Sequence, residues 1–232
     1  MSDAQVRGTI IEWRPDASAD LRRLTSELNG AIDAAEEGGA NWPLVIHLPS
    51  AETSDAFPSG DVSTEDVNRW ERTLFRLERS QLVTIAVLDG VVGGAAFDLL
   101  VATTVRVASE GAVVRLAVNA GQLWPGMSLF RLARESGVGA ARRILFADQL
   151  DAPMCAQFNL VNHVAQDLQS AIDSILASLH SIDHSEISRR WALVREGGIT
   201  LADDVLGLHL AACDRELRRL DALRSGPAEA SR

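Results

Sequence analysis

The sequence predicts an α/β fold in which helices pack outside a largely parallel sheet. Short β-branched segments alternate with amphipathic helices along most of the chain, and this alternation is typical of parallel sheets. The most apolar segment, Leu82 to Ala108, reads as strand, turn, helix and second strand. With 232 residues, 47% of them hydrophobic, the chain is long and apolar enough to bury a sizeable core.

The first predicted unit is a strand, a helix and a second strand. Thr9 to Trp13 forms the first strand and ends at Arg14-Pro15. The segment from Asp16 to Ala35 carries leucines and isoleucine at three- and four-residue spacing, which predicts an amphipathic helix. Gly38 follows this helix as a stop signal, and Leu44 to Leu48 is the second strand.

A polar loop from Pro49 to Asp61 separates this unit from the next helix. The loop is long enough to indicate a functional role. Ser63, followed by acidic residues, predicts the start of a helix that runs to about Arg79. The strand Val83–Leu88 then leads through Gly93-Gly94 into a short helix, Ala95 to Ala102.

The remaining predicted elements complete the sheet and then become helical. The strands are Val105–Ala108, Val113–Leu116 and Leu160–Val164, and the helices are Met127–Glu135, Ala140–Phe146 and Ala152–Asn159. Everything from Asp167 to Leu223 reads as helix, with breaks near Asp183 and Gly197. We therefore expect a core over residues 1–165 and a C-terminal helical region over 166–232 that mediates oligomerisation.

Charge and composition exclude several classes of protein. A net charge of −10 argues against binding to nucleic acid or to an anionic membrane. All basic residues are arginines, so no lysine-based mechanism is available. The apolar segment is interrupted by Asp89, Asp98 and Arg106, unlike a membrane span, and the N-terminus lacks the apolar run of a signal peptide. The expected location is the cytoplasm, where the two cysteines stay reduced.

Cofactor motifs are missing from the sequence. His180 and His184 have a metal-like spacing but no third ligand, so we expect no metal site. No glycine-rich nucleotide loop is present, and no redox cofactor is expected.

The turn at Gly93-Gly94 carries the main chemical hypothesis. A glycine-rich turn that feeds a helix leaves backbone N–H groups unpaired at the positive end of the helix dipole. Such a point can hold the oxyanion of a reacting carbonyl. The alternative is a tight strand-to-helix corner that only requires small residues.

Five motifs in order resemble the crotonase (enoyl-CoA hydratase/isomerase) superfamily over roughly residues 6 to 165. They are Arg14-Pro15, the FPSGDV loop from Phe57 to Val62, IAVLDGVVGGAAFDL from Ile85 to Leu99, Trp124-Pro125-Gly126, and the segment from Ile144 to Val164. In the last motif Asn159 replaces the usual glycine, which is tolerable if that residue is left-handed. The resemblance implies a crotonase-like ββα spiral.

The same resemblance implies a CoA thioester as substrate, with coenzyme A entering only as part of it. The thioester carbonyl would lie between the N–H groups of Gly60 and Ala95. Gly94 and Trp124 would line the substrate site, and Arg14 would meet the CoA phosphates. Trp124 is equally explained as core, and Arg14 as a solvated arginine.

The departures from the family pattern concern its two catalytic glutamates. The first falls on Asp98, and the second on Val118, which cannot transfer a proton. Since acid–base catalysis contributes roughly 10²–10⁴-fold, losing one partner should cripple ordinary hydration. Asp98 is then either the single acid/base or a retained buried carboxylate. If it is buried, we expect a basic partner or a place in the cavity.

Asp98, Val118 and the phrase from Asn119 to Leu132 look most like the auxiliary enzymes of 3,5-dihydroxyphenylglycine biosynthesis. That resemblance implies a lyase-like enzyme that helps a type III polyketide synthase, alongside sister crotonases, to make dihydroxyphenylacetyl-CoA for a glycopeptide-type antibiotic. It also implies a homo-oligomer, a trimer or hexamer. The alternatives are an ordinary hydratase or isomerase, and a non-catalytic module that activates a synthase.

Overall fold

The computed structural model describes residues 5–7, 10–38, 43–50, 62–119, 122–124, 126–179, 182 and 184–197. The chain divides into two compact units, residues 1–189 and 190–232. The predicted boundary at 165 remains a prediction.

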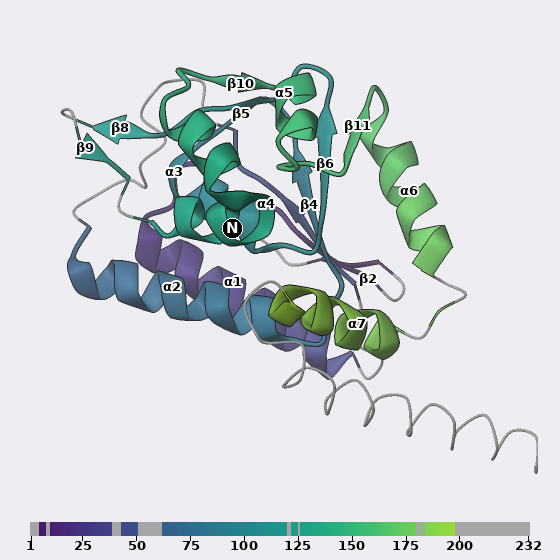
Figure 1. The fold of residues 1–232 in the computed structure, drawn as a ribbon. Coiled ribbons are helices and arrows are strands. Elements are labelled where there is room, and N and C mark those ends of the chain that lie inside the picture. Colours follow the sequence, from purple (N-terminus) through teal and green to yellow (C-terminus); the bar gives the residue numbers. More distant parts are fainter. Residues whose placement is uncertain are drawn as a thin grey trace, which may run out of the picture. The chain divides into compact units, whose positions relative to one another are not determined.

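A six-stranded sheet forms the centre of the first unit (Figure 1). Its strand order is β1-β2-β3-β4-β6-β11, with all pairs parallel except β1 and β2. The strands are β1 (Gln5–Arg7), β2 (Ile10–Trp13), β3 (Leu44–His47), β4 (Thr84–Leu88), β6 (Val105–Ser109) and β11 (His163–Ala165). The α/β class with a parallel sheet is thus confirmed.

The two faces of this sheet bury different sets of side chains, because strand residues alternate in direction. Ile46, Ala86 and Leu88 belong to the main core, which also contains residues of α1 (Leu21–Glu37), α2 (Thr64–Arg79) and α3 (Gly94–Ala102). Val45, Ile85, Val87 and Val107 point the other way and pack with Ile172 of α6 (Leu168–Leu179). The functional chemistry predicted on α3 therefore lies on the main-core side.

The structure also contains two smaller sheets. One has the order β10-β7-β5, with β5 (Val91–Val92), β7 (Val113–Val114) and β10 (Leu150–Asp151). The other is a hairpin of β8 (Val118–Asn119) and β9 (Gln122–Leu123), seen beyond α3 in Figure 1. The remaining helices are α4 (Ser128–Leu145), α5 (Ala152–Gln157) and α7 (His184–Gly197).

Helix boundaries follow from local capping. Helix α2 starts where the sequence predicts, and there Ser63 and Asp66 form a reciprocal capping box. Helix α1 begins at Leu21 rather than at Asp16, because Asp16 binds Ser18 in a local turn and Asp20 takes the capping position. Gly137, with φ of 84°, interrupts α4, which accounts for the two helices predicted there.

The sequence interpretation misses several short strands. Strands β5, β8, β9 and β10 have only two residues each, too few to show a periodic pattern in the sequence. The last strand begins at His163, not Leu160, because the preceding backbone closes a turn after α5. Asn162 then holds this turn to β6: its side-chain oxygen accepts from the Arg106 N–H at 2.8 Å.

Asn159 adopts the left-handed conformation, with φ of 58°. We expect Asn159→Ala to lower the free energy of unfolding by about 1 kcal/mol, because alanine tolerates this region poorly. Asn159→Gly should be close to neutral, since relief of strain offsets the added freedom of the unfolded chain. Thermal and urea unfolding check both variants. Gln157→Ala, exposed on α5, is the control and should change little.

Candidate functional site

The turn into α3 places backbone donors at a buried point. Gly93 is extended, Gly94 has φ of 55°, and the helix N-cap provides no side-chain hydrogen bond. The first helical bond runs from the Phe97 N–H to the Gly93 carbonyl at 3.3 Å. The N–H groups of Gly94, Ala95 and Ala96 precede it, and Ala95 is 3% exposed.

The neighbouring loop leaves the sheet beside this turn. The Ser50 hydroxyl accepts a hydrogen bond from the Val91 N–H at 3.0 Å, and Gly90 lies against Ser50 with φ of 84°. A side chain at position 90 would collide with that hydroxyl. Gly60, the predicted second donor, lies outside the described residues, so its position remains a prediction.

Asp98 lies one turn into α3 and is 0% exposed. Its Oδ2 accepts hydrogen bonds from the indole N–H groups of Trp124 and of Trp70, the latter at 3.4 Å. Its Oδ1 accepts from the Ser128 N–H at 3.1 Å. A buried Asp98 is expected to have a basic partner or a place in a cavity, but in the structure it accepts hydrogen bonds from three neutral N–H donors. Neutral donors can satisfy a buried carboxylate because each supplies a directed hydrogen bond.

Burial is the largest influence on the protonation of Asp98. It raises the pKa of this carboxyl to about 7, and the hydrogen bond from Trp124 opposes it. The charge of Glu71 raises the pKa further, whereas Arg131 and the Ser128 N–H lower it. The carboxyl therefore exchanges a proton near neutral pH, which is the property required of a general acid or base.

Glu71 of α2 and Asp98 of α3 share the N-terminal end of α4. The Met127 N–H donates to Glu71 Oε1 at 2.8 Å, next to the Ser128 N–H that binds Asp98. No side chain of α4 itself caps this end. Two carboxylates from neighbouring helices thus take the capping role at the positive end of the helix dipole.

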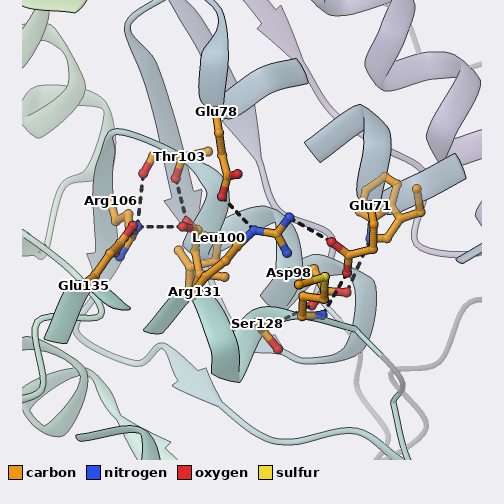
Figure 2. Close-up of polar contacts among 12 residues, drawn as sticks. Glu71, Glu78, Asp98, Leu100, Thr103, Arg106, Ser128, Arg131 and Glu135 are labelled. Atoms are coloured by element: carbon orange, nitrogen blue, oxygen red, sulfur yellow. Dashed lines mark hydrogen bonds and ion pairs between the residues drawn. The ribbon is translucent and has the colours of Figure 1, made fainter. Parts of the chain in front are cut away.

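Arg131 bridges this helix end to a second glutamate of α2 (Figure 2). Its guanidinium lies 2.8 Å from Glu71 Oε2 and 2.7 Å from Glu78 Oε1. The Arg131 side chain is 3% exposed and also covers the Phe75 ring at 5.1 Å. A buried cation held by two carboxylates fixes α4 against α2.

The opposite end of α3 is held by another buried arginine. Arg106 donates to the carbonyl groups of Val101 and Thr103 at 2.8 and 3.2 Å and to Glu135 at 2.7 Å (Figure 2). A cation at a helix C-terminus stabilises the helix dipole. The helix that carries Ala95 and Asp98 is consequently fixed at both ends.

A small pocket of about 40 Å³ lies beside Asp98. Its wall is mainly apolar, with Phe97, Leu116, Leu123 and Leu129. Three further lining residues, Trp124, Gly126 and Ser128, separate it from the Asp98 carboxyl. A Cβ added to Gly126 would lie 2.1 Å from Asp98 Oδ2, so the carboxyl is packed directly behind this wall.

The other predicted site residues are placed as follows. Trp124 lines the pocket and binds Asp98, so it is both pocket wall and core. Arg14 is 59% exposed and pairs with Glu12 at 3.4 Å. Val118, in the position of the second family glutamate, is 42% exposed on the β8–β9 hairpin and offers no proton-transfer group.

Sequence reasoning misses Trp70, Glu71 and Arg131. Trp70 and Glu71 belong to a helix that the sequence predicts as amphipathic. From the sequence alone, Glu71 cannot be told from the exposed acids of the same helix. The available signal is the absence of a capping side chain before α4, which leaves its first N–H groups in need of partners from elsewhere.

The described part of the chain shows neither a metal-binding cluster nor a membrane-spanning helix. Within it, no cluster of three or more His, Cys, Asp or Glu side chains is arranged to hold a metal ion. Nor does any helix there combine the length and the apolarity needed to cross a membrane.

No family model matches the chain, but similar proteins are named as enoyl-CoA hydratases or as a dienoyl-CoA isomerase. The chain is 36% identical over 197 residues to an enoyl-CoA-hydratase of Amycolatopsis orientalis, which covers 83% of this chain and 88% of that protein. It is 29% identical over 103 residues to a mitochondrial Delta(3,5)-Delta(2,4)-dienoyl-CoA isomerase of Dictyostelium discoideum. This match covers 44% of this chain and 35% of that protein.

Solved structures share the fold. The chain superposes on human enoyl Coenzyme A hydratase domain-containing protein 3 with a TM-score of 0.77, at 17% identity and with 99% of each chain covered. A Thermobifida fusca structure, described as an enoyl-CoA hydratase in complex with CoA, gives 0.77 at 20% identity, covering 95% of this chain and 94% of that one.

The raised pKa of Asp98 predicts a pH dependence of stability. The folded state keeps the proton up to about pH 7, whereas the unfolded state releases it above the ordinary aspartate pKa of 3.8. Between these values the folded state binds more protons, so the contribution of Asp98 to stability falls as pH rises, by up to about 1.4 kcal/mol per pH unit. Below this window the contribution is fully present.

Urea unfolding of the wild type and of Asp98→Asn across pH 4 to 8 tests this dependence. The difference in free energy of unfolding between the two proteins isolates the effect of Asp98 from that of other carboxyl groups. As pH rises towards about 7, the wild type should lose stability relative to Asp98→Asn. A difference that is constant with pH would show that Asp98 is ionised throughout.

Proposed function

Because the chain belongs to the enoyl-CoA hydratase (crotonase) family, we propose that it acts on an acyl-CoA thioester and stabilises enolate charge at the N-terminus of α3. The observation that carries this proposal is the buried Ala95 N–H in a turn opened by Gly93 and Gly94. A fold relative bound to CoA supports the same class of ligand.

The thioester oxygen would accept hydrogen bonds from Ala95 and from the predicted donor Gly60. Charge on that oxygen grows as the α-carbon loses its proton, so the donors bind the enolate more strongly than the substrate. The positive end of the helix dipole acts in the same direction. Because the donor is a backbone group, the alanine side chain at position 95 does not prevent this hydrogen bond.

Asp98 would be the single acid/base. Loss of water from a hydroxyacyl group breaks one C–H and one C–O bond, forms a C=C bond and needs no oxidant. One carboxyl can accept the carbon-bound proton and then return it to the departing hydroxyl. Val118 supplies no second group, which disfavours a concerted two-group mechanism and favours a stepwise route through the single carboxyl, in either direction of the reaction.

The finer proposal concerns substrate and partners. We propose that the chain assists dehydration and aromatisation of a polyketide CoA intermediate to 3,5-dihydroxyphenylacetyl-CoA, in the biosynthesis of a glycopeptide-type antibiotic. A type III polyketide synthase would supply the intermediate, and sister crotonases would complete the sequence. The support is the missing second glutamate and the shorter acid at position 98. A trimer or hexamer belongs to the same proposal.

The burial of Asp98 away from the pocket favours a second candidate function, that of a non-catalytic module that stimulates a synthase. Both carboxyl oxygens are bound by structural donors, and Trp124 separates them from the pocket. A pocket of about 40 Å³ is far smaller than the roughly 300–1,000 Å³ of typical ligand pockets, so Trp124 or the hairpin must shift before an acyl group can enter. If no such shift exposes Asp98, the carboxyl acts only as a support for α4.

Product analysis separates the two candidates. Malonyl-CoA is incubated with a type III synthase, with and without the chain, and products are followed by mass spectrometry. The wild type should raise the yield of 3,5-dihydroxyphenylacetyl-CoA, and Asp98→Asn should lower that stimulation by about 10²-fold or more. Asp173→Asn, exposed on α6, is the control and should behave as wild type.

The outcomes have distinct meanings. Full stimulation by folded Asp98→Asn supports the non-catalytic module. Identical products with and without the wild-type chain contradict both synthase proposals, and turnover of crotonyl-CoA would then favour an ordinary hydratase.

Substitutions at position 95 test the backbone donor. Ala95→Pro removes the N–H in the first helical turn, where proline is tolerated, and should lower the rate by about 10²–10³-fold. Ala95→Val adds comparable bulk but keeps the N–H, so it controls for packing. Thermal unfolding verifies that both variants fold. If Ala95→Pro and Ala95→Val lose the same activity, the N–H is not the donor.

A further inference from the structure

We propose that Glu71 and Arg131 are positioning residues for Asp98, and that this pair sets how readily the Asp98 carboxyl exchanges its proton. The inference deepens the proposed function, because it assigns a regulator to the suggested acid/base. Neither residue lines the small pocket beside Asp98, so both would act through Asp98 rather than on a substrate.

The geometry links the two carboxyl groups through one helix end. Consecutive N–H groups of the α4 terminus hold them: Met127 binds Glu71 and Ser128 binds Asp98. Since the spacing of consecutive amides is fixed by the backbone, Glu71 and Asp98 cannot move apart while both bonds persist. Both groups are buried, so their repulsion is screened less than at the surface.

Among the described residues, Arg131 is the cation that forms ion pairs within this cluster. Among the described charged groups, Glu71 from α2 raises the pKa of Asp98 and Arg131 from α4 lowers it. The indoles of Trp70 and Trp124 and the Ser128 N–H donate hydrogen bonds to the same carboxyl. Arg131 forms its ion pairs with Glu71 and Glu78, not with Asp98. Within the described residues Asp98 therefore forms no ion pair of its own, and its protonation responds to the charges of Glu71 and Arg131.

The signs of the two effects are opposite. Removing the charge of Glu71 relieves repulsion and leaves Arg131 less neutralised, so both changes favour ionised Asp98. Removing Arg131 does the reverse. Opposite shifts from two partners of one ion pair cannot arise from a general loosening of the packing, which would move Asp98 in the same direction in both variants.

Infrared titration of the full chain measures the effect directly. The C=O stretching band of the protonated carboxyl is followed against pH and assigned to Asp98 by its loss in Asp98→Asn. Glu71→Gln should lower the midpoint by about one pH unit, and Arg131→Gln should raise it. Glu71→Asp keeps the charge but withdraws it by one methylene group, and its smaller downward shift decides the question if Glu71→Gln does not fold.

Glu78→Gln is the matched control. It removes the other carboxylate of Arg131 but leaves the end of α4 unchanged, so its shift should be smaller than that of Glu71→Gln. Equal shifts in Glu71→Gln and Glu78→Gln, or an unchanged midpoint in folded Glu71→Gln, would overturn the proposal.

The titration is independent of enzymatic activity. If the midpoint shifts as expected and the pH profile of product formation follows it, both the inference and the acid/base role hold. If the midpoint shifts but the pH profile does not, the positioning role holds and the proposed catalytic role of Asp98 fails.

Discussion

The N-terminal end of α4 is the point on which the candidate site depends. A helix without its own capping side chain needs acceptors for its first N–H groups, and here Glu71 and Asp98 provide them from two other helices. Because each carboxylate is buried, each in turn needs these donors. The mutual requirement ties α2, α3 and α4 into one unit, and Arg131 completes it.

This arrangement gives one carboxyl group two physical roles. As an anion, Asp98 supports the helix terminus and orients Trp124 and Trp70. As a neutral acid, it loses part of that attraction, while burial favours its protonation. Stability and proton transfer are therefore coupled at the same group. A shift of Trp124 would change both the packing of the pocket and the protonation of Asp98.

The turn before α3 is constrained separately. Gly94 is left-handed, and Gly90 leaves no room beside Ser50 for a side chain. These two glycines fix the direction of α3, while Arg106 fixes its far end. The Ala95 N–H and Asp98 thus lie on one rigid helix, so any approach of a substrate to both must involve the surrounding loop, hairpin or Trp124.

The sequence by itself determined the α/β class and the positions of α2 and α3, and it indicated two helices where Gly137 interrupts α4, because each depends on local patterns of hydrophobicity, capping and backbone freedom. It required Asn159 to be left-handed if it replaces a glycine, and the structure shows that conformation. It also singled out Asp98 as the charged residue of an apolar helix. Only the tertiary structure decided what surrounds Asp98. Trp70 and Glu71 lie 28 and 27 positions before it, and Ser128 and Arg131 lie 30 and 33 positions after it. No local pattern encodes such contacts, since they arise only when three helices pack together and their buried polar groups must find partners.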